Sequence, residues 1–107
     1  MDIGRNFDRR LRGVMLMVIL LRTFRISAQY PYALVKDMKM HKSHFFSSIT
    51  KNDIYNAISM LESRGFISYK MKNGKKYYAT TKKGNDLLKH ASAELKRSLI
   101  EVGKLIG

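Results

Sequence analysis

Residues 50–84 read TKNDIYNAISMLESRGFISYKMKNGKKYYATTKKG, and this stretch decides the fold. Thr50 stands three residues before Asp53, a capping-box pattern that starts a helix, with Asp in the place of the usual Glu. Apolar residues at positions 54, 57, 58 and 61 continue it at helical spacing. Gly65 can adopt the left-handed conformation that favours a helix C-terminus. The first half of the stretch therefore predicts a helix that ends at Gly65.

The second half of the stretch predicts a β-hairpin followed by a helix. Asn73-Gly74 is a strong hairpin signal because both turn residues tolerate a positive φ. Residues 66–72 and 75–80 flank this turn and are expected to be the two strands. Thr81 then caps a final helix that should reach nearly to the C-terminus.

Two more helices are expected before this stretch, over residues 8–26 and, starting at Pro31, over residues 31–40. The residues expected to face inward are Leu11, Val14, Met15, Val18, Leu21 and Phe24 in the first helix, and Tyr32, Leu34, Val35 and Met38 in the second. Further apolar residues widen the face of the first helix, so it should lie at the centre of the fold. Residues 41–48 are expected to form a loop. Three helices, a hairpin and a long helix predict a mainly α fold with an α+β wing, the winged helix-turn-helix.

The last helix carries a heptad pattern. Leu88, Leu95 and Val102 recur every seven residues, while Leu99 and Ile106 occupy offset positions together with the polar Ser92. An isolated helix would expose these side chains, so we expect it to pair with a second copy and with the first helix. The predicted dimer interface is Leu88, Leu95, Leu99, Val102 and Ile106. Residues 1–86 would form the winged helix-turn-helix domain with a basic N-terminal extension, and residues 87–107 the dimerisation helix of the same unit. The alternative is a helix that folds back over its own domain.

Charge points to a polyanionic partner. The chain has 21 Lys and Arg against 8 Asp and Glu, a formal net charge of +13. An excess of this size repels itself in a compact domain, which a nucleic acid would relieve. The alternative is a generally basic proteome whose lysines are simply solvated.

Several classes of protein are disfavoured. The absence of cysteine excludes a disulfide scaffold, a cysteine zinc site and a thiol nucleophile. His41-x-x-His44 lies in the expected loop with Asp37 as its one nearby carboxylate, so we expect no metal, no cofactor and no enzyme. The apolar run 14–21 follows an arginine-rich start as in a signal peptide, but it is too short to span a bilayer. We expect no membrane contact and a cytoplasmic, nucleoid-associated protein.

Residues 16–88 resemble the winged helix of PadR-like transcriptional regulators. Residues 53–67, DIYNAISMLESRGFI, match the tyrosine, the apolar spacing and the glycine-hydrophobic exit of the family's third helix, with Asp53 where the family often has Thr. Residues 76–84, KYYATTKKG, are close to its Tyr-Tyr-x-Leu-Thr-x-x-Gly ending. Pro31-Tyr32 stands where the family usually has Gly-Tyr. The resemblance implies dimeric DNA binding through the third helix and the wing.

Candidate DNA contacts lie at the start of the third helix, off its apolar stripe. A helix reads bases in the major groove through side chains near its N-terminus, where lysine can donate to guanine and asparagine can pair with adenine. The predicted base contacts are Thr50, Lys51, Asn52, Tyr55 and Asn56. The alternatives are that Thr50 only caps the helix and that Tyr55 packs in the core.

Phosphate contacts are expected mainly from the wing, where Lys70 and Lys72 should share one face, opposite Tyr69 and Met71. The predicted phosphate contacts are Ser48, Arg64, Lys70, Lys72, Lys75 and Lys76. The alternative is that the lysines protect a sheet edge from aggregation. A second cluster, Arg5, Arg9, Arg10 and Arg12, could reach flanking phosphates or the partner subunit.

The sequence thus favours a homodimeric transcriptional regulator that binds double-stranded DNA sequence-specifically. Three alternatives stay open: a sequence-neutral architectural DNA-binding protein, an RNA-binding protein, and a winged helix that binds an acidic protein. No dedicated ligand domain is expected, and whether a small-molecule effector exists is undecided.

Overall fold

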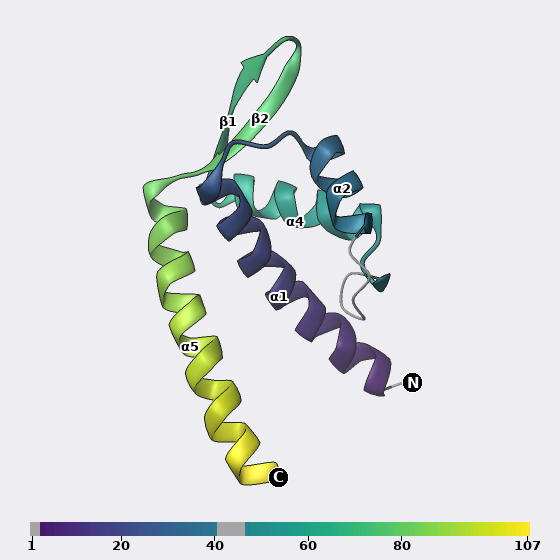
Figure 1. Cartoon of the computed structure of the whole chain (residues 1–107), viewed down its shortest axis with the longest axis vertical. Helices are drawn as coiled ribbons and strands as arrows, with labels where there is room; N and C mark the ends of the chain where they lie inside the picture. Colours follow the sequence, from purple (N-terminus) through teal and green to yellow (C-terminus); the bar gives the residue numbers. More distant parts are fainter. Residues whose placement is uncertain (1–2, 41–46) are drawn as a thin grey trace.

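The computed structural model describes residues 3–40 and 47–107. Its elements, in chain order, are α1 (Ile3–Ile26), α2 (Pro31–Met40), α4 (Lys51–Ser63), β1 (Ile67–Lys72), β2 (Lys75–Thr80) and α5 (Lys82–Ile106). Figure 1 shows the β1–β2 hairpin extending from one end of the molecule, while α1 and α5 diverge towards the other. The predicted winged helix-turn-helix is confirmed. The predicted loop lies outside the described residues from 41 to 46, together with His41 and His44.

Local signals set the ends of α4 as predicted. The Thr50 side chain accepts a hydrogen bond of 3.1 Å from the Asp53 backbone N–H, and the Thr50 N–H donates to the Asp53 carboxylate at 2.9 Å, which completes a capping box. Gly65 has a φ of +79° and turns the chain out of the helix.

The hairpin also follows its predicted turn. Asn73 and Gly74 have φ values of 51° and 75°, and Lys72 pairs with Lys75 across the turn. A feature that the sequence did not predict anchors the hairpin at its base. Gln29, between α1 and α2, forms a bridge with Tyr78 through backbone hydrogen bonds of 3.0 and 2.7 Å. The bridge gives β2 a second backbone neighbour beside β1.

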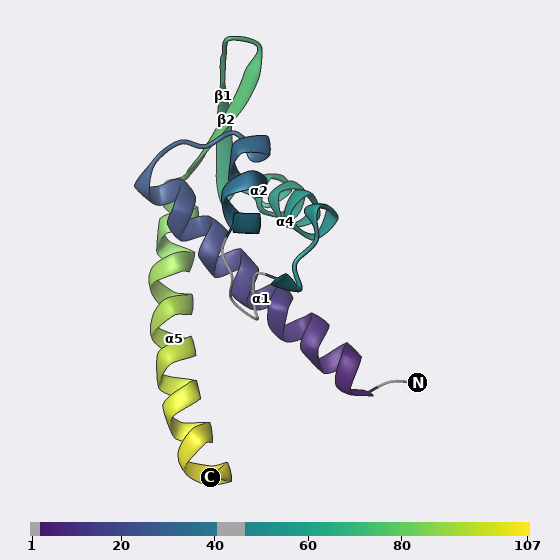
Figure 2. The same ribbon diagram turned by 45° about the vertical axis from the view of Figure 1, so that its right-hand side comes forward.

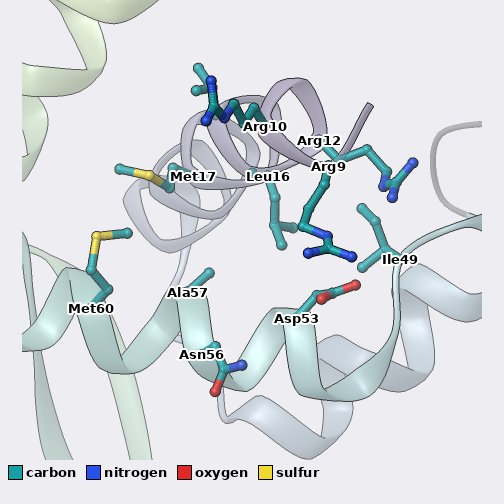
Figure 3. A pocket seen from close by; sticks show the side chains of 12 residues that line it. Arg9, Arg10, Arg12, Leu16, Met17, Ile49, Asp53, Asn56, Ala57 and Met60 are labelled. Carbon is teal, nitrogen blue, oxygen red and sulfur yellow. The ribbon is translucent and has the colours of Figure 1, made fainter. Parts of the chain in front are cut away.

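Helix α1 runs through the fold, but only its C-terminal half is buried. It begins at Ile3, five residues before the expected start, and buries Leu16, Leu20, Leu21 and Phe24. The prediction that Leu11 and Val14 face the core is wrong, because these side chains are 43% and 50% exposed. The N-terminal half of α1 projects beyond the layer formed by α2 and α4 (Figure 1), so Leu11 and Val14 stay exposed in the described part of the chain. A groove opens between this half of α1 and α4 (Figure 3).

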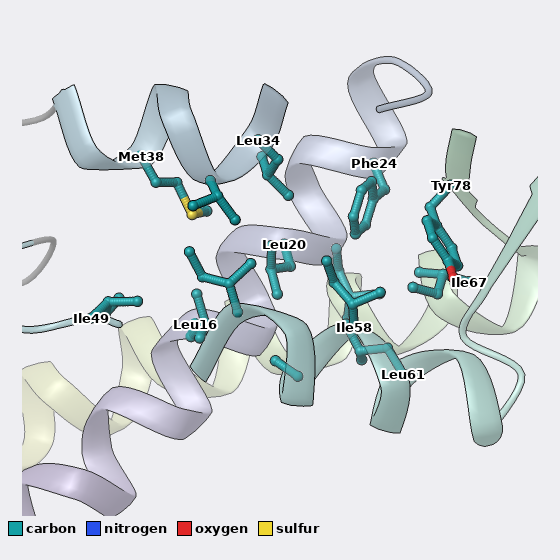
Figure 4. Packing of buried hydrophobic residues seen from close by; sticks show 14 of the residues in the cluster. Leu16, Leu20, Phe24, Leu34, Met38, Ile49, Ile58, Leu61, Ile67 and Tyr78 are labelled. Atoms are coloured by element: carbon teal, nitrogen blue, oxygen red, sulfur yellow. The ribbon is translucent and has the colours of Figure 1, made fainter. Parts of the chain in front are cut away.

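The core lies where α1 meets α2, α4 and the base of the hairpin (Figure 4). Its buried side chains from α2 onward are Leu34, Val35, Met38, Ile49, Ile54, Ala57, Ile58, Leu61, Ile67, Tyr78 and Leu88. Tyr32 was predicted to face inward, yet it is 60% exposed and stacks on Tyr30 with ring centroids 6.0 Å apart. Because Tyr32 is the second residue of α2, it lies at the rim of the core, where the neighbouring tyrosine covers one side of its ring.

Tyr78 joins the core to α4. Its hydroxyl donates a hydrogen bond of 3.2 Å to the Glu62 carboxylate, and its ring packs against Phe24 and Tyr69. Burial, with a further contribution from the neighbouring Glu62 carboxylate, raises the pKa of Tyr78 to about 12.

Helix α5 starts against the corner between α4 and β1. The Thr81 side chain accepts from the Gly84 N–H at 3.1 Å and donates to the Gly65 carbonyl at 2.7 Å, so the predicted cap is confirmed. Leu88, predicted to lie at the dimer interface, is only 4% exposed because α5 packs against α1 at this point. That prediction is corrected, since Leu88 already belongs to the core of its own chain. Beyond it, α5 separates from the domain, as both views show (Figures 1 and 2).

Candidate nucleic-acid interface

The first turns of α4 present the predicted base-contacting side chains to solvent. Thr50, Lys51, Asn52 and Asn56 are all exposed. Asn52 and Asn56 are four residues apart and lie on the same side of the helix. The Lys51 ammonium lies 5.7 Å from the centre of the Tyr55 ring, a cation–π contact. The capping role of Thr50 leaves its side chain exposed at the positive end of the helix dipole.

Tyr55 lies at the boundary between the core and the surface. The residue is half-buried against the core and also lines a hollow of about 290 Å³. The hollow is also lined by Tyr30, just before α2, by Tyr32 in its first turn, by Ser59 of α4 and by Lys76 of the wing. We call the group Tyr30, Tyr32 and Tyr55 the tyrosine cluster. The hollow brings α4, the start of α2 and the wing together on one surface.

The wing carries lysines on both of its faces. Directly paired residues share a face, so Tyr69, Met71 and Lys76 lie on one face, and Lys70, Lys72 and Lys75 lie on the other. The prediction that Lys70 and Lys72 oppose Tyr69 and Met71 is therefore confirmed. Aromatic rings hold several of the ammonium groups: Lys76 lies 4.4 Å from the Tyr69 ring centre and Lys75 lies 4.7 Å from that of Tyr30.

No ion pair among the described residues compensates these lysines. In the described part of the chain, ion pairs join Lys82 to Asp86 and Arg97 to Glu94, and both pairs lie on α5. No carboxylate of the described residues pairs with a wing lysine. A positively charged hairpin without internal compensation attracts phosphates.

Two predicted phosphate contacts occupy different ends of α4. Ser48 is half-buried just before the helix starts. Arg64 caps the other end, roughly 20 Å away for a helix of 13 residues, where its carbonyl accepts a 2.7 Å hydrogen bond from Lys83. The structure therefore groups Ser48 with Lys51 and Asn52 and separates Arg64 from them, at the base of the wing.

Tyr30 and Tyr32, two members of the tyrosine cluster, were not predicted to belong to the site. Tyr32 was predicted to face inward and Tyr30 was given no role, but both contribute to the surface beside α4. The signal was present as two tyrosines flanking Pro31. Lys75 and Tyr77, which contact Tyr30, lie more than 40 residues later in the chain, so sequence spacing does not reveal these contacts.

Comparison with solved structures gives a match to a PadR family transcriptional regulator from Eggerthella lenta DSM 2243, with 32% sequence identity and a TM-score of 0.79. The match covers 98% of this chain and 93% of that one. The chain belongs to the PadR family. A PadR family transcription regulator from Clostridium difficile R20291 has the same fold at 20% identity, with a TM-score of 0.73 over 86% of this chain and 98% of that one.

Sequence comparisons give less functional information about this PadR-family chain. A family model described as a protein of unknown function, DUF3116, matches residues 16–94, so the chain belongs to that family as well. A search of curated proteins returns no match. The 16–94 match spans the winged helix and the first half of α5, which is the region that carries the surface described above.

A second surface of the PadR-family fold is apolar and lies away from the wing. The end of α5 exposes Leu99, Ile100, Val102, Leu105 and Ile106, and Leu95 is half-buried. The outer half of α1 exposes Ile3, Phe7 and Leu11, which follow each other at intervals of four residues along one side. We call these the α5 stripe and the α1 stripe. Monomeric proteins rarely expose apolar side chains over so much of two helices.

The described residues also bear on metal binding and on membrane insertion. Residues 3–40 and 47–107 contain no group of three or more His, Asp or Glu side chains placed to hold a metal ion. Over the same residues, no helix combines the length and the apolar character needed to cross a membrane.

Proposed function

We propose that this PadR-family chain is a transcriptional regulator that binds specific sequences of double-stranded DNA as a homodimer. One observation carries the proposal: the exposed start of α4 and the lysine-bearing wing border the same hollow through Tyr55 and Lys76. A duplex lying along this surface would meet both elements at once. The proposed effect on transcription would be exerted in the cytoplasm, on the nucleoid.

The start of α4 would enter the major groove. Lys51 can donate to the acceptor edge of guanine, and Asn52 or Asn56 can make a bidentate pair with adenine. Thr50, at the helix N-terminus, would face a phosphate. Tyr55 would contact the duplex with the part of its ring that the core does not cover.

The wing would bind the phosphates that border an adjacent minor groove. Because Lys76 projects from one face and Lys70, Lys72 and Lys75 from the other, a hairpin placed in the groove would direct positive charge to both flanking strands. Ser48 would support the contact at the start of α4, and Arg64 would extend it at the base of the wing. A hairpin that used lysines only to guard its edge would not need them on both faces.

The apolar α5 and α1 stripes would form the dimer. Each contains large side chains more than 40% exposed in one chain, and pairing two copies would remove them from water. Residues 1–86 would act as the DNA-binding unit, and residues 87–107 as the dimerisation helix. A twofold pair of α4 helices would then read two half-sites roughly 10 base pairs apart.

Selection of bound duplexes from a random library tests the proposal. The expected result is a pseudo-palindromic motif with half-sites about one helical turn apart. Strong binding without sequence enrichment would instead identify an architectural DNA-binding protein. Preference for an RNA hairpin over duplex DNA, or no retention of nucleic acid at low salt, would refute DNA binding as the function.

A further inference from the structure

The wing needs support from outside its own two strands. The sheet of the described residues consists of β1 and β2, and the backbone bridge from Gln29 reaches β2 at Tyr78. A hairpin of two strands is marginally stable by itself and is usually stabilised by a third strand or by packing on a helix. Figures 1 and 2 both show the hairpin extending away from the helices. The direction of its outer part must therefore depend on side-chain contacts.

Tyr30, just before α2, supplies such contacts. Its ring lies against that of Tyr77 in β2, with ring centroids 5.9 Å apart, and the Lys75 ammonium lies 4.7 Å from its centre. The Lys72 ammonium in turn lies 5.9 Å from the centre of the Tyr77 ring. Of the ring and cation–π contacts among the described residues, those that reach the hairpin beyond Tyr78 from another element both come from Tyr30. One side chain therefore connects the outer part of the wing to the helical domain.

Tyr30 is itself held by the helical domain. Its carbonyl accepts a 3.2 Å hydrogen bond from the Leu34 N–H at the start of α2. Its neighbour Gln29 forms the backbone bridge to β2, and the Tyr32 ring stacks on its other side with centroids 6.0 Å apart. The residue is half-buried. A ring fixed at these points can determine where the wing side chains that contact it lie.

We propose that Tyr30 is a positioning residue that fixes the direction of the wing before DNA is bound. A wing that is already ordered loses less conformational freedom on binding, so its lysines reach phosphates at a smaller entropic cost. The Lys75 ammonium carries three N–H donors, so it can face the Tyr30 ring and still donate to a phosphate. The effect on DNA affinity rests on the proposed function, whereas the order of the wing is a property of the free protein.

Backbone order parameters from ¹⁵N relaxation of the free protein test the position of the wing directly. In the wild type we expect residues 71–76 to match α4, with values of about 0.85. Tyr30→Leu, which replaces the ring by an aliphatic side chain, should lower them to below about 0.6. Tyr30→Phe keeps the ring face that holds Lys75 and should keep the wild-type values. Tyr32→Leu is the matched control, because the ring contact of Tyr32 is with Tyr30 and not with the wing.

Three results of the relaxation experiment would overturn the proposal: a wing that is already mobile in the wild type, an ordered wing in Tyr30→Leu, or equal loss of order in Tyr30→Phe or Tyr32→Leu. If Tyr30→Leu does not fold, Lys75→Met removes the ammonium from the same ring and leaves the start of α2 unchanged. Lower order at residues 71–76 is expected in that variant too. Wild-type order there would refute the role of the contact.

Binding to DNA separates positioning from direct contact. In fluorescence anisotropy, Tyr30→Leu should weaken the binding of a selected and of an unrelated duplex by the same factor, at least fivefold. The slope of log K against log salt concentration should not change, because the bound wing neutralises the same phosphates. Tyr30→Phe should restore the affinity although it lacks the hydroxyl.

Other outcomes in DNA binding have distinct meanings. A smaller salt slope in Tyr30→Leu, or an equal loss of affinity in Tyr30→Phe, would make Tyr30 a DNA contact and refute its positioning role. Unchanged affinity in Tyr30→Leu would refute the proposed benefit of an ordered wing. Absence of duplex binding by the wild type would be a failure of the proposed function, and the relaxation result on the free protein would stand independently of it.

Discussion

Gly84→Ala should be among the most damaging small substitutions in this chain, because of where the first turn of α5 lies. A Cβ built at this position would be 2.0 Å from the Phe66 carbonyl oxygen and 2.6 Å from Cγ2 of Thr80. Carbon–oxygen contacts are normally about 3.3 Å or longer, so the backbone must move by more than about 1 Å. Phe66 resists this movement because its N–H donates to the Leu61 carbonyl at 2.9 Å and its carbonyl accepts from the Thr81 N–H at 3.1 Å.

The expected cost follows from these contacts. Overpacking of a tight site costs about 1–3 kcal/mol, and loss of the hydrogen bond from Thr81 to Phe66 adds about 1 kcal/mol. For a domain of this size, a total of about 2–4 kcal/mol corresponds to a fall in Tm on the order of 10–25 °C. Thermal unfolding followed by circular dichroism at fixed protein concentration measures it.

Gly13→Ala is the matched control for this prediction. The same methyl group meets no atom within 4 Å there, and replacing glycine inside a helix stabilises it by about 1 kcal/mol. The Tm of Gly13→Ala should therefore rise by a few degrees. If both variants unfolded at the wild-type temperature, the close approach of α5 to Phe66 would be refuted.

Three further predictions concern the core, the wing and the dimer. Tyr78→Phe should lower the free energy of unfolding by about 1 kcal/mol at neutral pH, because the hydrogen bond to Glu62 is lost. Since the pKa of Tyr78 in the folded state, about 12, exceeds the ordinary 10.0, the wild type should lose this advantage over the variant between pH 10 and 12. A stability difference in denaturant titrations that stays constant over this pH range would contradict the prediction. Lys76→Ala should reduce the slope of log K against log salt concentration by about 2 per dimer in fluorescence anisotropy, because each phosphate contact contributes about 0.9. Asn52→Ala should instead reduce the discrimination between the selected and an unrelated duplex by about 1–3 kcal/mol. Identical salt slopes and identical discrimination in the two variants would show that the two residues do not have distinct roles. Leu99→Glu should weaken dimerisation at least tenfold in sedimentation velocity. Leu99 is 66% exposed in one chain, so pairing of two copies would bury the new charge in the interface. Unchanged dimerisation would show that the α5 stripe is not part of the interface.

The sequence predicted well those features that local chemistry determines. The Thr50–Asp53 capping box, the Asn73-Gly74 turn and the Thr81 cap each need only a few neighbouring residues, and all three are present. The family-like Thr-x-x-Gly ending was also visible at residues 81–84. The reason for a glycine at position 84 could not be predicted from the sequence. The backbone that would clash with a side chain there belongs to Phe66, which the hairpin separates from Gly84 in the chain.

Features that depend on distant packing were predicted less well. Helix α1 is apolar on several sides between residues 14 and 21, so periodicity alone could not select the side that meets α2 and α4. Leu11 was assigned to the core because it continues the three- and four-residue spacing of this helix, although it is exposed. Leu88 fits the heptad pattern, but the packing of α5 on α1 uses it within one chain. Arg9 and Arg12 were recognised only as part of a basic cluster, because the α4 residues that line the same groove lie far from them in the sequence.

The most direct measurement of the central claim is the mass of the complex with a selected duplex, determined by native mass spectrometry. Two chains, each presenting the start of α4 and its wing to one duplex, predict a complex of two protein chains per duplex that dissociates steeply with added salt. A complex of one chain per duplex, or none at any salt concentration, would contradict the proposal that paired copies of this surface recognise DNA.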